Sequence, residues 1–192
     1  QFSAGPESEG AYPGPACYGA GGRLRITDVN MLLGRMFPSS FGIPVDIEYA
    51  RRCLKELKLE YTSLHNLPDE QILQGFFEIA NEKMAKAIEK VSIAKGYEPS
   101  EYCLLAFGGA GGIHACKIAE ILRIDEIIIP YDAGILSAVG IAYSRIERII
   151  HRQILNNYEK VNPDLTDILK EMQSEGMQAI SADGYDIAEF VT

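Results

Sequence analysis

A continuous apolar run at residues 102–107, YCLLAF, leads directly into the glycine-rich sequence GGAGG at residues 108–112. An apolar run without polar alternation is typical of a buried strand, and four glycines in five residues predict a sharp turn. Helical periodicity follows as far as about Arg123, then a second apolar strand is predicted at 126–130 and a helix at 133–144. This strand–helix–strand–helix order predicts an α/β fold with parallel strands in a buried sheet.

The segments before the first strand are predicted to be mostly helical. Residues 5–22 contain six glycines and three prolines, which predict a loop. A short helix ending near Met36 is expected after a cap at Thr27 or Asp28, and a second helix is expected after a cap at Asp46.

The longest predicted helix covers residues 69–95. Pro68-Asp69-Glu70 is a good helix start, and Gly96 stands where a C-terminal cap belongs. One apolar stripe is predicted along this helix. Its members are Ile72, Phe76, Ile79, Ala80, Met84, Ala87, Ile88 and Val91.

The composition is that of an ordinary globular protein, with 47% hydrophobic and 23% charged residues. No run approaches the ~18 apolar residues that a membrane span needs. A formal charge of −9 argues against nucleic acid or an anionic membrane as a partner. The four cysteines lack zinc-site spacing, so reduced, mostly buried thiols and a cytoplasmic location are expected. The first residues show no secretory signal, and without an initiator Met a processed end or a piece of a longer protein is expected.

The turn is also the best candidate for ligand binding. Gly108, Gly109, Ala110, Gly111 and Gly112 let the backbone approach a ligand closely, and free N–H groups at the following helix start favour an anion such as phosphate. Neither standard nucleotide motif is complete. The dinucleotide fingerprint needs Gly or Ala where this chain has His, and no Lys-Ser/Thr pair follows the glycines. Nucleotide contact and a turn that serves only helix–sheet packing are therefore both open.

His114 lies in the first turn of the helix after the glycines. The helix dipole is expected to lower its pKa there, so that the imidazole is neutral. His114 is the weak candidate for a catalytic or substrate-orienting role, with capping or packing as the favoured alternative. Cys17 is a still weaker candidate nucleophile. No metal ligands are identified.

Four stretches resemble the hydantoinase A / 5-oxoprolinase family in both order and spacing. They are GPESEGA at 5–11 with PGPACYG at 13–19, TDVNMLLGR at 27–35, IANEKMAKAI at 79–88 and FGGAGGIHA at 107–115. The resemblance covers residues 5 to about 145. In two places the chain departs from the family. It has Gly112-Ile113 where the family usually has Pro-Leu before His-Ala, and it has Glu9 where a small residue is common.

The resemblance implies part of an actin-like ATPase fold of the sugar kinase and Hsp70 type, with a helical subdomain. It implies an ATP-hydrolysing hydrolase that opens a cyclic amide or imide, such as 5-oxoproline, hydantoin or N-methylhydantoin, through phosphorylation of the carbonyl oxygen. The cofactor would be ATP with Mg. Residues 108–112 would contact the adenosine side of ATP, with Asn81 and Glu82 as weak candidates for the ribose or adenine.

The resemblance also implies partners. These are a hydantoinase B-like subunit or domain and the upstream half of the chain's own ATPase domain, whose Asp-x-Gly-Gly-Thr phosphate-binding loops are not in this sequence. Since phosphoryl transfer depends on such loops, the chain alone is expected to be inactive.

The expected organisation has three parts. Residues 1–66 would form a glycine-rich loop and a helical lobe or insertion, residues 67–150 the α/β half of the nucleotide-binding lobe, and residues 151–192 the start of a C-terminal region. A further strand is predicted around 146–155 and a helix around 163–175.

Three other functions are open. The chain would then belong to an acetone carboxylase-like ketone-activating subunit, to a non-catalytic subunit-assembly module, or to a dinucleotide-dependent oxidoreductase that uses the same turn and Asp132.

Overall fold

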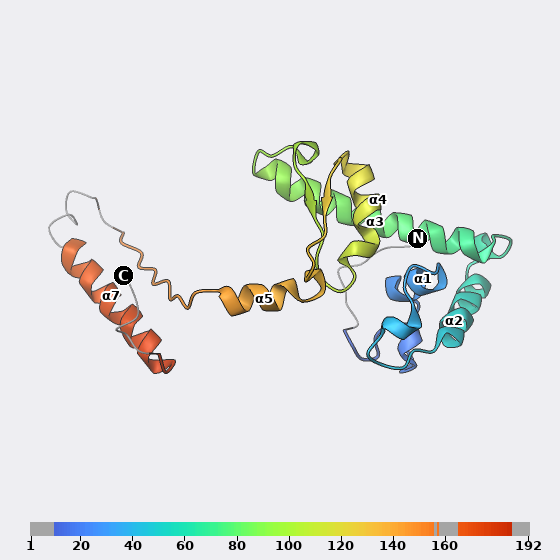
Figure 1. Cartoon of the computed structure of the whole chain (residues 1–192), viewed down its shortest axis with the longest axis horizontal. Coiled ribbons are helices and arrows are strands. Elements are labelled where there is room, and N and C mark those ends of the chain that lie inside the picture. Colours follow the sequence, from blue (N-terminus) through green and yellow to red (C-terminus); the bar gives the residue numbers. More distant parts are fainter. Residues whose placement is uncertain (1–9, 156, 158–164, 186–192) are drawn as a thin grey trace. The chain divides into compact units, whose positions relative to one another are not determined.

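The computed structural model describes residues 10–155, 157 and 165–185 (Figure 1). Contacts within the chain divide it into two compact units, Gln1–Val139 and Gly140–Thr192, which are treated separately below. The segments expected at 1–66 and 67–150 fall largely within the first unit, and the boundary between them stays a prediction. In the described ranges, no helix is both long enough and apolar enough to cross a membrane.

Helix α3 (Asp69–Ala94) is the scaffold of the first unit (Figure 1). Two acidic residues in its first turn suit the positive end of the helix dipole. Its C-terminal end is followed by Gly96 with φ 80°, a conformation that favours glycine. The predicted helix at 69–95 is therefore confirmed. Helix α1 (Ile26–Leu32) packs against α3 and against α2 (Ile47–Glu60), and α4 (Gly111–Leu122) packs against α3 as well.

The core consists mainly of two hydrophobic clusters that α3 connects. The first contains Val29, Leu54, Leu64, Ile72, Leu73 and Phe77. The second contains Ala85, Ile118, Ala119, Leu122 and Ile124.

The predicted stripe of α3 is confirmed in part. The buried residues of this helix are Ile72, Leu73, Phe77, Asn81 and Ala85. Of the predicted stripe, Ile72 is buried and Phe76, Met84 and Ile88 pack against the two clusters. Ile79 and Val91 are 38% and 58% exposed, so the stripe is wrong at these positions.

Asp28 fastens the N-terminal loop to α1. Its carboxylate is fully buried and accepts hydrogen bonds from the backbone N–H groups of Ala16 (3.0 Å), Cys17 (2.7 Å) and Arg25 (2.7 Å). Arg25 is the N-cap residue, so the predicted cap at Thr27 or Asp28 is wrong. Asp28 instead reaches back from the third helical position to the loop.

The other helix boundaries follow local signals. Helix α1 ends at Leu32 rather than Met36, because Gly34 then adopts φ 70°. The predicted cap of α2 is confirmed, since the Asp46 side chain accepts a hydrogen bond from the Tyr49 N–H at 2.8 Å. Within the described part of the predicted loop, only the short 3₁₀ helix Ala16–Tyr18 interrupts irregular structure.

Strands β1 (Leu104–Leu105) and β2 (Ile127–Ile128) form a parallel pair, as predicted. Leu104 pairs with Ile127, and both side chains pack against the second hydrophobic cluster. Leu105 pairs with Ile128, and these side chains are 48% and 47% exposed. Among the described residues, then, the sheet is covered on one face only, and the prediction of a fully buried sheet is wrong. The strands are also shorter than the apolar runs at 102–107 and 126–130.

The predicted helix at 133–144 is confirmed as a short 3₁₀ helix, Ala133–Ile135, followed by α5 (Leu136–Tyr143). In the second unit, residues 146–155 form no strand, so that prediction is wrong. Helix α7 (Leu165–Ala182) extends beyond the predicted end at 175. Two arginines of the 146–155 segment pair with acidic side chains of α7 or of the residue after it. Arg152 contacts Glu171 at 2.7 Å and Glu175 at 3.3 Å, and Arg148 contacts Asp183.

Asp28→Asn is expected to lower the free energy of unfolding by about 3 kcal/mol, because the new NH₂ group faces backbone donors and leaves them unpaired. Urea unfolding followed by circular dichroism measures this loss. Asp46→Asn is the matched control. Its exposed side chain accepts one hydrogen bond at a cap where Asn serves equally well, so less than about 0.5 kcal/mol is expected. Equal losses in the two variants would contradict the role of Asp28.

Candidate functional site

Three buried polar side chains meet where α4 begins. His114 lies between Asn30 of α1 and Asn81 of α3, which are 84 and 33 residues away in sequence. Its Nε2 is 3.0 Å from Asn30 Nδ2, and its Nδ1 is 3.1 Å from Asn81 Oδ1. The exposed fractions are 2% for Asn30, 0% for Asn81 and 7% for His114. We call these three residues the Asn–His–Asn network.

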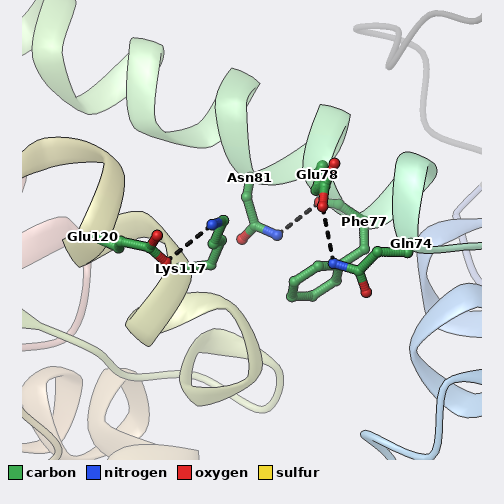
Figure 2. Close-up of polar contacts among 6 residues, drawn as sticks. All are labelled: Gln74, Phe77, Glu78, Asn81, Lys117 and Glu120. Atoms are coloured by element: carbon green, nitrogen blue, oxygen red, sulfur yellow. Dashed lines mark hydrogen bonds and ion pairs between the residues drawn. The ribbon is translucent and has the colours of Figure 1, made fainter.

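The contacts determine the tautomer of His114. An amide Nδ2 can only donate, so the Nε2 atom of His114 accepts from Asn30 and carries no proton. In a neutral ring Nδ1 then carries the proton and donates to Asn81 Oδ1. The Nδ2 atom of Asn81 donates in turn to the Phe77 carbonyl oxygen at 2.7 Å (Figure 2). Donors and acceptors therefore alternate consistently around a neutral imidazole.

The surroundings of His114 also favour the neutral ring. Burial and the nearby Arg35 guanidinium lower the pKa of His114 below its ordinary value. The Phe77 ring stacks on the imidazole with centroids 5.1 Å apart, and the Arg35 guanidinium lies 3.9 Å from the centroid of the same Phe77 ring. The predicted direction of the pKa shift is confirmed, but its causes are burial and Arg35, whereas the sequence argument relied on the helix dipole.

The glycine turn at 108–112 lies between β1 and α4. Gly108 has φ 85°, which favours glycine, and its N–H donates to the Ala133 carbonyl oxygen at 2.8 Å. A Cβ atom at Gly109 or Gly112 would meet no atom within 4 Å. The positive φ therefore accounts for glycine at 108, whereas neither backbone conformation nor packing requires glycine at 109 or 112. At those two positions the missing side chains leave the N–H groups at the start of α4 open to a ligand.

The two other candidate residues lie in different surroundings. Asn81 is fully buried with both amide atoms bonded inside the protein, whereas Glu82 is exposed and lies 3.7 Å from Lys86 Nζ. Successive residues of a helix point about 100° apart, so Asn81 and Glu82 cannot share one face. Their contact with nucleotide stays a prediction.

Sequence reasoning missed the partners of His114. It did not consider Asn30, Phe77 or Arg35 at this site. Asn30 is also notable because its Oδ1 atom is buried without a hydrogen-bond partner among the described residues. One feature of the sequence could have pointed to these partners. Asn30, Asn81 and His114 each lie in a different family motif, at 27–35, 79–88 and 107–115.

The surroundings of Cys17 do not favour a nucleophile. Cys17 is fully buried, and burial together with its hydrogen bond to Asp28 raises the pKa of its thiol to about 12. Cys103 and Cys116 are exposed, so the expectation of mostly buried thiols is wrong for these two. Within the described ranges, no group of three or more His, Cys, Asp or Glu side chains is arranged to hold a metal ion.

The family model described as Hydantoinase/oxoprolinase matches residues 1–150. The chain belongs to the hydantoinase/oxoprolinase family. A 5-oxoprolinase from Dictyostelium discoideum is 44% identical over 154 residues, an alignment that covers 73% of this chain and 12% of the relative. The family resemblance found in the sequence motifs is thus confirmed.

Solved structures show the same fold as this family member. A nucleotide-free structure of acetone carboxylase superposes with a TM-score of 0.70 at 22% identity, covering 97% of this chain and 28% of that chain. The ATP-dependent caprolactamase from Pseudomonas jessenii gives a TM-score of 0.63 at 27% identity, covering 96% and 28%. Caprolactamase subunit alpha from that organism is 29% identical over 189 residues, or 94% of this chain and 27% of the relative. The chain therefore spans between about an eighth and somewhat over a quarter of the length of these proteins.

The free energy of unfolding is expected to fall as the pH is lowered from about 7 to about 5. The unfolded chain binds a proton at His114 near pH 6.5, whereas the folded chain binds it only at lower pH because the pKa is lowered. This contribution is fully present above pH 6.5 and is lost as the pH falls through the folded-state pKa. Urea unfolding of wild type and His114→Gln at several pH values measures it as a pH-dependent difference.

His65→Gln is the control for this measurement, because the His65 ring is exposed. It should retain the wild-type pH dependence. A difference between wild type and His114→Gln that does not change with pH would contradict a buried neutral His114.

Proposed function

We propose that this chain is part of an ATP-dependent enzyme subunit that hydrolyses a cyclic amide or imide, with the glycine turn at 108–112 on the adenosine side of ATP. The observation that carries the proposal is an open glycine turn at the start of α4 in a member of this family. Two relatives, 5-oxoprolinase and caprolactamase, are named for lactams, and the caprolactamase is described as ATP-dependent.

The residues of the turn fit a nucleotide. Gly109 and Gly112 present backbone without side chains, and α4 contributes the partial positive charge of a helix N-terminus. ATP supplies the phosphoryl group that activates the substrate carbonyl toward water. Phosphoryl transfer needs charge neutralisation around the phosphates, which we assign, together with Mg, to the upstream half of the ATPase domain. The 192 residues alone are therefore expected to bind nucleotide without turnover.

Cyclic amides are favoured over ketones as the substrate class. The 5-oxoprolinase is 44% identical to this chain, whereas acetone carboxylase at 22% identity shows a common fold only. We place the chain in an actin-like ATPase domain, with residues 1–66, 67–150 and 151–192 in the roles expected from the sequence. The four free thiols suit the cytoplasm.

The exposed apolar face of the sheet is evidence for further protein partners. Leu105, Phe107 and Ile128 are each between 47% and 48% exposed. The opposite face of the sheet already packs against the second hydrophobic cluster, and an exposed apolar surface of this kind marks an interaction site. We propose that the upstream half of the ATPase domain covers this face and that a hydantoinase B-like subunit or domain completes the enzyme. The name of one relative, caprolactamase subunit alpha, supports a multi-subunit enzyme.

Isothermal titration calorimetry with ATP, AMP and NAD, each with and without magnesium, tests the nucleotide site. Similar binding of ATP and AMP is expected, because the adenosine side makes the contacts. Gly109→Val should weaken both by about tenfold or more, because the side chain enters the open space where the ligand approaches.

Gly42→Val is the matched control, since a Cβ atom at Gly42 also meets open space but lies outside the turn. It should leave nucleotide affinity unchanged. Preference for NAD over AMP would favour the oxidoreductase alternative. Equal effects of Gly109→Val and Gly42→Val would show that the turn does not contact the nucleotide.

The apolar sheet face is expected to cause self-association of the chain at high concentration. The double variant Leu105→Glu, Ile128→Glu should weaken this association about tenfold or more in analytical ultracentrifugation, because charges replace the apolar contact. The control Leu59→Glu, Val91→Glu changes two other exposed apolar residues, which are 77% and 58% exposed on α2 and α3. Equal effects of the two double variants would show that the sheet face has no special role.

A further inference from the structure

We propose that His114 is a positioning residue that holds the glycine turn in its nucleotide-binding arrangement by linking α4 to Asn30 and Asn81. The proposal rests on the nucleotide contact proposed for residues 108–112. It assigns to Asn30, which the sequence analysis did not select, a role in that contact.

His114 is arranged to act through position. Only 7% of the residue is exposed, and both ring nitrogens are bonded to amide groups inside the protein. Neither nitrogen is therefore available to a substrate in this arrangement. His114 lies two residues after Gly112, so its place determines where the first N–H groups of α4 point.

The turn is held at both ends. At its start, the Gly108 N–H donates to the Ala133 carbonyl oxygen. At its end, Ile113 packs against the first hydrophobic cluster and His114 bridges two helices. Between these anchors, Gly109 and Gly112 have no neighbours within reach of a Cβ atom. The conformation of the turn therefore depends on its two ends rather than on packing of its own residues.

The Asn30 amide serves the His114 ring rather than its own hydrogen bonding. Its Nδ2 lies 3.0 Å from His114 Nε2, and its buried Oδ1 has no hydrogen-bond partner among the described residues. An unpaired buried acceptor is unfavourable. An apolar residue would remove that acceptor but would leave Nε2 without its donor, so holding the neutral ring in one orientation accounts for asparagine here.

The charges around His114 keep that orientation. The Arg35 guanidinium acts on the imidazole from beyond the end of α1 and disfavours a second proton. The groups that α3 places against the ring, Phe77 and Asn81, are uncharged. On α4 itself, Lys117 pairs with Glu120 at 2.9 Å (Figure 2).

The test measures ATP affinity by calorimetry on the full 192-residue chain, together with the free energy of unfolding. Asn30→Leu removes the donor to Nε2 and also the unpaired oxygen. We expect some loss of stability, because Nε2 loses its donor, and ATP binding weakened about tenfold. His114→Ala should weaken ATP binding at least as much, and His114→Gln, whose amide oxygen can still accept from Asn30, should recover most of the affinity.

Leu73→Ala is the matched control. Leu73 is buried in the first hydrophobic cluster and is not part of the Asn–His–Asn network. It should lower the urea midpoint of unfolding and leave the ATP affinity of the folded protein unchanged. Amide hydrogen exchange at residues 109–113 should accelerate in His114→Ala but not in Leu73→Ala.

The outcomes separate the two proposals. A wild-type chain that binds no ATP would overturn the proposed function. ATP binding that Asn30→Leu and His114→Ala leave unchanged would overturn the positioning role alone. Equal loss of affinity in Leu73→Ala and His114→Ala would show that His114 contributes only stability.

Discussion

The packing of α1, α3 and α4 in the first unit brings together three buried polar side chains that hydrogen-bond around His114. Burying an amide or imidazole without a hydrogen-bond partner costs several kcal/mol, so Asn30, Asn81 and His114 must meet if α1, α3 and α4 are to pack together. Apolar contacts alone would allow these helices to slide past one another. The donor and acceptor pattern removes that freedom, and it also requires a neutral His114.

The Asn–His–Asn network affects the arrangement of the glycine turn and of the start of α4. His114 fixes the start of α4. The turn at 108–112 follows β1 and is held at its first residue by the hydrogen bond from the Gly108 N–H to the Ala133 carbonyl oxygen. The unit leaves two surfaces open, the turn itself and the sheet face that carries Leu105 and Ile128. We interpret the first as the place for a small ligand and the second as the place for more protein.

Local signals in the sequence were sufficient for much of the fold. Pro68 and Gly96 bracket α3, Asp46 caps α2, and the apolar runs around Leu104 and Ile127 pair in parallel. One source of error is that polar residues in the core were interpreted as capping groups. Asp28 was taken for a helix cap, although its carboxylate binds a loop eleven and twelve residues away.

The sequence by itself determined the family, the cap of α2, the bounds of α3, and the position of a glycine turn after a strand. These features depend on residues that are neighbours in the chain, so their spacing is visible in one dimension. Only the tertiary structure decided which partners His114 has, which tautomer it adopts and which sheet face stays exposed. Those properties arise from contacts across 33 and 84 residues, and no local pattern specifies which distant side chain a buried polar group will meet.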